Sequence, residues 1–204
     1  MQGQEYLNQI STSNRQVQKS GNKILSSKFF IVGAIGAILL VLILIIGAIL
    51  NAGKGGEEES SYALILHVNS TVEEIQEFQT NIKSSILRSD AGSLQGVLSN
   101  TSTKLTTYLE GKYNYKESNI SSSLTAEAEA NKTVLHNELF EAKINGILDR
   151  IFAHKMVYEI SLFLAEEGKL LKMTNDEDLT TILSTSYKSL ENLKTNFEDF
   201  SEGK

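Results

Sequence analysis

"AEAEANKTVLHNELFEAKINGILDRIFAHKMVYEISLFLAEEGKLLKM", residues 126–173, decides the fold, because this long stretch is rich in helix formers and contains no proline. A single helix of roughly fifty residues would be unusual in a globular domain, so we expect a break near Asn145 and Gly146. The break gives two helices of about 20 and 25 residues. Apolar side chains cover most of the second helix over 147–164, which predicts helical partners on several of its sides.

Two further helices are predicted before this stretch. Residues 60–89, SSYALILHVNSTVEEIQEFQTNIKSSILRS, carry apolar residues at alternating steps of three and four from Ile65 to Ile86. This spacing predicts one amphipathic helix of about 28 residues. The triplet DAG at 90–92 predicts a turn, and a weaker apolar stripe then predicts a second helix over 94–112.

A last helix is predicted over 177–201. Thr174 and Glu177 match a capping box, which marks its start, and its leucines and phenylalanines follow heptad spacing that is interrupted only at Ser186. No segment shows the sustained alternation of apolar and polar residues that strands require. The sequence therefore predicts an all-α fold in which residues 59–204 form an antiparallel bundle of four or five helices.

The stretch FFIVGAIGAILLVLILIIGAIL, residues 29–50, has no charged, amide or hydroxyl side chain. As a helix it would extend roughly 33 Å, slightly more than the ~30 Å apolar core of a bilayer. We predict one N-terminal transmembrane helix here, with cleavage just after it as the open alternative that would release the outer domain. Gly33 and Ala37 form a small-xxx-small pair, which predicts self-association of the span.

The flanking charges give the orientation of the span. Residues 1–28 carry four Lys and Arg against one Glu, whereas Glu57, Glu58 and Glu59 follow the span. The positive-inside rule then leaves the basic tail, predicted to be disordered, in the cytoplasm and the C-terminal domain outside the plasma (inner) membrane. The glycines of segment 51–58 predict a flexible joint between span and bundle.

Composition excludes several classes of function. The chain has no cysteine, which removes disulfides, thiolate metal sites and cysteine nucleophiles. Residues 57–204 carry fourteen Lys and Arg against twenty-four Asp and Glu. This acidic balance disfavours a nucleic-acid partner for the outer domain, whereas the basic tail suits the anionic inner leaflet of the bilayer.

No motif for chemistry stands out. No histidine has a carboxylate at the spacing of di-iron or zinc helices; the three are His67, His136 and His154. His154 lies in the apolar stretch, so we expect a hydrogen-bonded core or subunit-interface residue. Phosphate loops and nucleophile elbows are missing too, and we expect no enzymatic activity, no metal and no cofactor. Tyr113 and Tyr115, in a loop predicted over 111–123, are the candidate surface contact residues.

The plan of the whole chain, a basic tail, an apolar span and a cysteine-free helical domain ending in TILSTSYKSLENLKTNFEDF (181–200), resembles uncharacterised single-pass envelope proteins of small-genome candidate-phylum bacteria. By helix order, the outer domain is also similar to ferritin-like bundle domains of unknown function in bacterial secreted proteins. Neither resemblance assigns a role to a residue of this chain.

These observations favour a structural or protein-interaction component of the cell envelope, bound to another envelope protein or to its own copies as a weak homo-oligomer. The alternative is an extracytoplasmic ligand-sensing module that signals through the single span, although only the tail of 1–28 would be available for the signal. The thin apolar stripe of 94–109 beside the apolar 147–164 predicts an exposed apolar strip for a partner, unless the loop 111–123 covers it.

Overall fold

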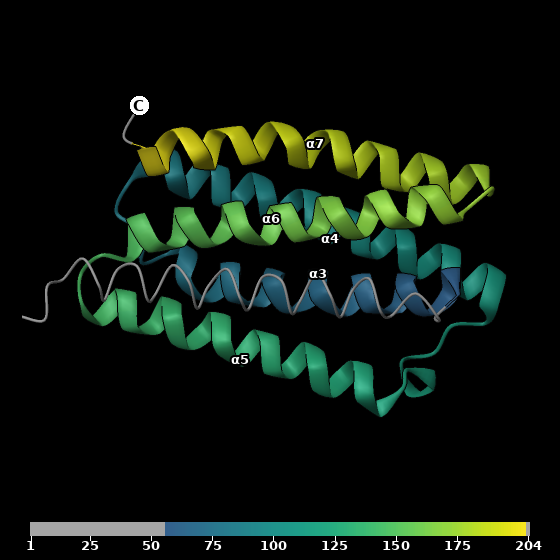
Figure 1. Cartoon of the computed structure of the whole chain (residues 1–204). Helices are drawn as coiled ribbons and strands as arrows, with labels where there is room; N and C mark the ends of the chain where they lie inside the picture. Colours follow the sequence, from purple (N-terminus) through teal and green to yellow (C-terminus); the bar gives the residue numbers. More distant parts are fainter. Residues whose placement is uncertain (1–55, 203–204) are drawn as a thin grey trace, which may run out of the picture. The chain divides into compact units, whose positions relative to one another are not determined.

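The computed structural model describes residues 56–202, which form five α-helices and one short 3₁₀-helix, with no strand among the described residues (Figure 1). The all-α fold predicted for residues 59–204 is therefore confirmed for the described part of the chain. In chain order the elements are α3 (Glu57–Gln79), α4 (Ser85–Tyr113), η1 (Glu117–Asn119), α5 (Ser122–Ile144), α6 (Leu148–Met173) and α7 (Glu177–Glu202).

The predicted tail and span, with Gly33 and Ala37, lie outside the described residues. Among the helices of residues 56–202, none combines the length and the apolar character needed to cross a membrane. The helix α3 begins at Glu57, inside the segment 51–58 predicted as a joint.

Four of the helices form a bundle, and the fifth packs outside it. The helices α3, α4, α7 and α6 each contact the next around a ring, which closes through contacts between α6 and α3 (Figure 1). The helix α5 lies outside this ring and contacts α3 and α6 (Figure 1). Each helix runs antiparallel to the next one in the chain (Figure 1). Since α4 alone of the α-helices lies between α3 and α5 in the chain, α3 and α5 run parallel.

The core is made by apolar side chains that the helical repeat of each segment brings to one face. Phe78 of α3, Phe152 and Phe163 of α6 and Phe197 of α7 are fully buried there, surrounded by leucine and isoleucine from all five helices. The heptad spacing predicted for the last helix is confirmed by five buried residues: Leu179, Leu183, Leu190, Leu193 and Phe197. Burial of this apolar surface supplies most of the stability of a domain without disulfides.

The prediction of one helix over 60–89 was wrong, because the chain turns between Gln79 and Ser85. Ile82 stays buried inside this turn, whereas Ile86 lies in the first turn of the next helix and is 69% exposed. The turn is held from a distant part of the chain: the Asp149 carboxylate of α6 accepts hydrogen bonds from the backbone N–H groups at positions 83 and 84. Ser84 then caps α4 through its hydroxyl, which accepts from the N–H of Leu87.

The turn predicted at 90–92 was also wrong, since these residues lie inside α4. Ala91 is fully buried, and Gly92 leaves room for the side chain of Gln79. The Gln79 amide reaches the next helix there and donates to the carbonyl of Arg88. The triplet therefore serves the close packing of α3 on α4 and does not end a helix.

The predicted break at Asn145 and Gly146 is confirmed, with α5 ending at Ile144 and α6 beginning at Leu148. Gly146 has a φ of 71°, and the N–H of Ile147 donates to the carbonyl of Ala142 across it. A left-handed glycine with this hydrogen bond is a common way to end a helix, because it satisfies a free carbonyl at the helix end.

The capping box predicted at Thr174 and Glu177 was wrong by two residues. The Asp176 carboxylate accepts from the N–H groups of Asp178 and Leu179, so Asp176 caps α7. Thr174 instead accepts from the N–H of Asp176 and orients this cap.

Over 147–164 the exposed large apolar side chains are limited to Ile147 at the start of this range, so the exposed apolar strip predicted there does not run along the helix. The helix α6 is flanked by α3, α5 and α7, as its apolar circumference predicted. His154 was expected in the core or at a subunit interface; the first expectation was wrong, because the side chain is exposed on the outer face of α6.

We expect opposite effects when two glycines are changed to alanine. Gly146→Ala places a Cβ at a positive φ and lowers the free energy of unfolding by about 1 kcal/mol. The control is Gly96→Ala, at an exposed position inside α4 with open space around it. This change raises the free energy of unfolding by about 0.5 to 1 kcal/mol. Urea unfolding of the purified protein, followed by circular dichroism, measures both changes. If both variants changed the free energy of unfolding in the same direction, the left-handed conformation of Gly146 would be contradicted.

Candidate functional site

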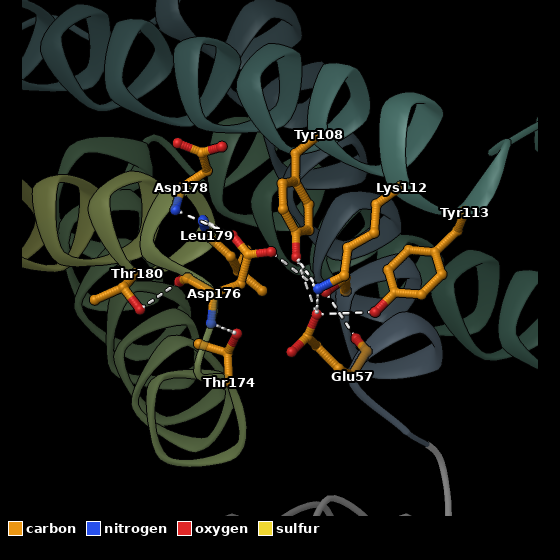
Figure 2. A network of polar contacts seen from close by, with 10 residues as sticks. Glu57, Tyr108, Lys112, Tyr113, Thr174, Asp176, Asp178, Leu179 and Thr180 are labelled. Carbon is orange, nitrogen blue, oxygen red and sulfur yellow. Dashed lines mark hydrogen bonds and ion pairs between the residues drawn. The ribbon is translucent and has the colours of Figure 1, made fainter.

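The first polar cluster ties the beginning of α3 to two other parts of the bundle (Figure 2). One oxygen of the Glu57 carboxylate accepts hydrogen bonds from the Tyr108 hydroxyl at 3.0 Å, the Tyr113 hydroxyl at 2.9 Å and the Lys112 ammonium at 2.8 Å. The Lys112 ammonium also lies 3.1 Å from Asp176, before α7. We call these five residues the Glu57 network.

The electrostatics of the Glu57 network favour the ionised carboxylate. Burial alone would raise the pKa of Glu57, but the hydrogen bonds from Lys112 and from the neighbouring hydroxyls outweigh it and lower the pKa to about 2. Ionised Glu57 therefore stabilises the fold above its ordinary pKa of 4.5, and this contribution is lost as the pH falls toward 2.

Replacement of Glu57 tests this network. We expect Glu57→Gln to lower the free energy of unfolding by about 1.5 to 3 kcal/mol at neutral pH, because hydrogen bonds to a charged group are lost. The difference from the wild type should shrink between pH 4.5 and pH 2. Glu59→Gln is the matched control, in the same first turn but exposed, and should change stability by less than about 0.5 kcal/mol. If the difference in free energy of unfolding between the wild type and Glu57→Gln stayed constant across this pH range, the lowered pKa of Glu57 would be contradicted.

The second cluster is an imidazole between two carboxylates inside the bundle. His67 of α3 bonds Glu159 through Nε2 at 2.8 Å and Glu166 through Nδ1 at 3.0 Å, and both acids lie on α6. The ring packs on Phe163, which lies between the two acids on α6, with ring centroids 4.2 Å apart. Burial would lower the pKa of His67, but the two carboxylates outweigh it and raise the pKa to about 10. The imidazole is therefore charged at neutral pH.

A third group of polar side chains links α4 to α7 and to α3. Thr101 of α4 donates to the hydroxyl of Ser186 of α7, and Ser102 of α4 donates to the Asn69 amide oxygen of α3. Glu167 of α6 is 1% exposed, and neither of its carboxylate oxygens has a hydrogen-bond partner within residues 56–202. Burial raises the pKa of Glu167 to about 8, with only partial opposition from nearby Ser186, so this acid is mostly protonated at neutral pH.

Removal of the charged His67 imidazole should destabilise the fold. We expect His67→Leu to lower the free energy of unfolding by about 3 to 5 kcal/mol, because Glu159 and Glu166 are left without their partner. Below pH 6.5 the stabilisation by His67 is complete, and it is lost as the pH rises toward 10.

Two further variants make this test specific to the charge pairing. A triple variant that also carries Glu159→Leu and Glu166→Gln should recover most of the loss, since no unpaired buried charge remains. His154→Leu, at an exposed position, should change stability by less than about 0.5 kcal/mol. Additive losses in the triple variant would contradict the pairing. Thermal unfolding measures all of these changes.

The fourth cluster lines an open cleft of about 300 Å³ between α3 and α5. Glu74 and Glu77 come from α3, and His136 faces them from α5. The Nδ1 atom of His136 lies 3.0 Å from a carboxylate oxygen of Glu74 and 3.6 Å from one of Glu77. The remaining lining residues are Glu129, Lys132 and Thr133 of α5. Within the described residues, this is the group of carboxylates and histidine whose geometry could hold a metal ion.

The predicted contact residues Tyr113 and Tyr115 do not stand free on a loop. Tyr113 is the last residue of α4 and bonds Glu57, and Tyr115 packs its ring on Tyr62 with centroids 5.2 Å apart. Both are only partly exposed and pack against the core, so they do not stand on an exposed loop, and their role as surface contact residues stays a prediction. Asn114 between them is in the left-handed conformation, with φ of 53°, and turns the chain back at the end of α4.

Sequence reasoning missed the clusters around His67 and His136. In each case the histidine and its carboxylates lie on different helices, more than fifty positions apart in the chain. The available signal was the i, i+3 spacing of Glu74 and Glu77, which places both acids on one helical face.

No protein-family model, curated protein or solved structure matches this chain. The resemblance to single-pass envelope proteins and to ferritin-like bundle domains therefore stays a prediction.

Proposed function

We propose that this protein is a membrane-anchored, extracytoplasmic helical bundle that acts as a structural or protein-interaction component of the cell envelope. In this proposal residues 29–50 anchor the chain in the plasma membrane with the N-terminus in the cytoplasm. The bundle then binds another envelope protein or further copies of itself, and it has no enzymatic role.

The observation that carries the proposal is a group of exposed apolar side chains at one end of the bundle. Ile86 and Ile144 are each 69% exposed, and Phe140 and Ile147 are also open to solvent. Asp149 binds the backbone of the turn before α4, so this turn and the start of α6 lie at the same end (Figure 1). Apolar side chains that gather at one end are typical of a surface that contacts another protein. We call these four residues the end surface.

The interior of the bundle supports a binding role more than a catalytic one. The polar side chains inside the bundle bind one another across the helices: Thr101 bonds Ser186, and Ser102 bonds Asn69. His67 is enclosed by Glu159 and Glu166. A side chain held in this way stabilises the fold and is poorly placed to reach a substrate. The runner-up, a ligand-sensing module that signals through the single span, is favoured by the open cleft beside Glu74.

The first experiment tests the anchored topology. Because the chain has no cysteine, single variants Ser13→Cys and Ser123→Cys can be labelled without background in intact cells. A maleimide that does not cross membranes should label position 123 and leave position 13 unlabelled until the cells are lysed. Label at position 13 in intact cells, or protection of position 123, would contradict the proposed orientation.

The second experiment tests the end surface in the full-length protein in mild detergent. We expect Ile86→Ser with Ile144→Ser to weaken self-association or capture of a partner by about tenfold or more, as loss of buried apolar contacts does. The control is Val134→Ser with Met173→Ser, two exposed apolar residues away from the end surface. Gly33→Leu with Ala37→Leu should weaken self-association through the span. Equal binding by all variants would contradict the proposal.

A further inference from the structure

The cleft between α3 and α5 brings together three groups of the kind that ligate metal ions. Carboxylate oxygens of Glu74 and Glu77 and a ring nitrogen of His136 all lie within 4.8 Å of one another. Bonds of ~2.0 to 2.2 Å to a metal ion place neighbouring ligand atoms ~3.0 to 3.5 Å apart. The 3.0 and 3.6 Å separations from His136 Nδ1 to the two acids are already close to these values.

The burial of Glu74 makes a cation favourable at this point. Its side chain is 2% exposed, whereas Glu77 is about half exposed at the mouth of the cleft. A divalent cation at this point would compensate the charge of the buried Glu74 carboxylate.

The surroundings hold the ligands in place. The ring of His136 lies 5.5 Å from Phe78 and stacks on Phe140 at 6.1 Å, measured between ring centroids. Lys132, the cation among the lining residues, is paired with Glu73 outside the three ligands, and Glu129 adds another acid to the wall. The cleft has room for the water molecules that would complete the coordination of a metal ion.

We propose that Glu74, Glu77 and His136 form a binding site for a divalent transition-metal cation of the class of Zn²⁺. One imidazole nitrogen with two carboxylate oxygens suits this class, whereas Ca²⁺ takes oxygen ligands alone. Because a nitrogen that binds a metal carries no proton, the hydrogen bond between His136 Nδ1 and Glu74 would be replaced by bonds from both side chains to the ion.

Metal binding at this site would fasten α5 to the bundle. The helix buries only Leu135, Leu139 and Ala142 and lies outside the four-helix ring. Two of the proposed ligands belong to α3 and the third to α5, so the ion would join the two helices directly. The site therefore gives the least buried helix a stability that depends on metal.

Calorimetric titration of the untagged full-length protein with Zn²⁺, in mild detergent and chelator-treated buffer, tests the site. We expect one Zn²⁺ per chain, a higher unfolding temperature, and slower hydrogen exchange in α5. Glu77→Gln and His136→Gln should each weaken binding by about tenfold or more, since each removes a ligand. Ca²⁺ at the same concentration should not raise the unfolding temperature.

Controls separate this site from nonspecific binding. His154→Gln changes an exposed imidazole on α6 and should bind Zn²⁺ as the wild type does. Glu77 is largely exposed, so Glu77→Gln should fold normally and report on the ligand alone. Absence of Zn²⁺ binding by the wild type, unchanged binding by both ligand variants, or equal binding of Ca²⁺ would overturn the proposal. The anchored topology and the end surface do not depend on this result.

Discussion

The ion pairs of His67 with Glu159 and Glu166 set the relation between α3 and α6 on which the other contacts depend. A slip of one helical turn would leave charged groups without partners in the interior, which costs several kcal/mol. With α3 and α6 held in register, α5 packs against both of them. The meeting of His136 with Glu74 follows from this packing.

The helical segments were predictable wherever the apolar repeat was strong. The break at Gly146 and the heptad residues of α7 follow from local sequence alone, because a left-handed glycine and a regular repeat act within a few residues. The turn between α3 and α4 was not predictable in this way. Its backbone is held by Asp149, which lies 65 positions away, and Ile82 keeps the apolar spacing through the turn.

The candidate site was less predictable than the fold, since it depends on which helices become neighbours. Periodicity shows that Glu74 and Glu77 share a helical face, but it does not show that α5 runs parallel to α3 and brings His136 opposite them. Tyr113 illustrates the same limit. In the sequence, a tyrosine beside a polar loop is expected to be exposed. The hydrogen bond from Tyr113 to Glu57 could not be predicted, because it depends on the packing of α4 beside the start of α3.

The Glu57 network also determines how a mechanical load would enter the bundle. Glu57 is the first residue of α3, so a pull on the chain at residue 55 would reach it before any other helical turn. Its bonds pass part of that force to α4 through Tyr108 and Lys112, and Lys112 shares it with Asp176 before α7. A force along the polypeptide would therefore be divided among several helices, and the first turn of α3 would resist unravelling.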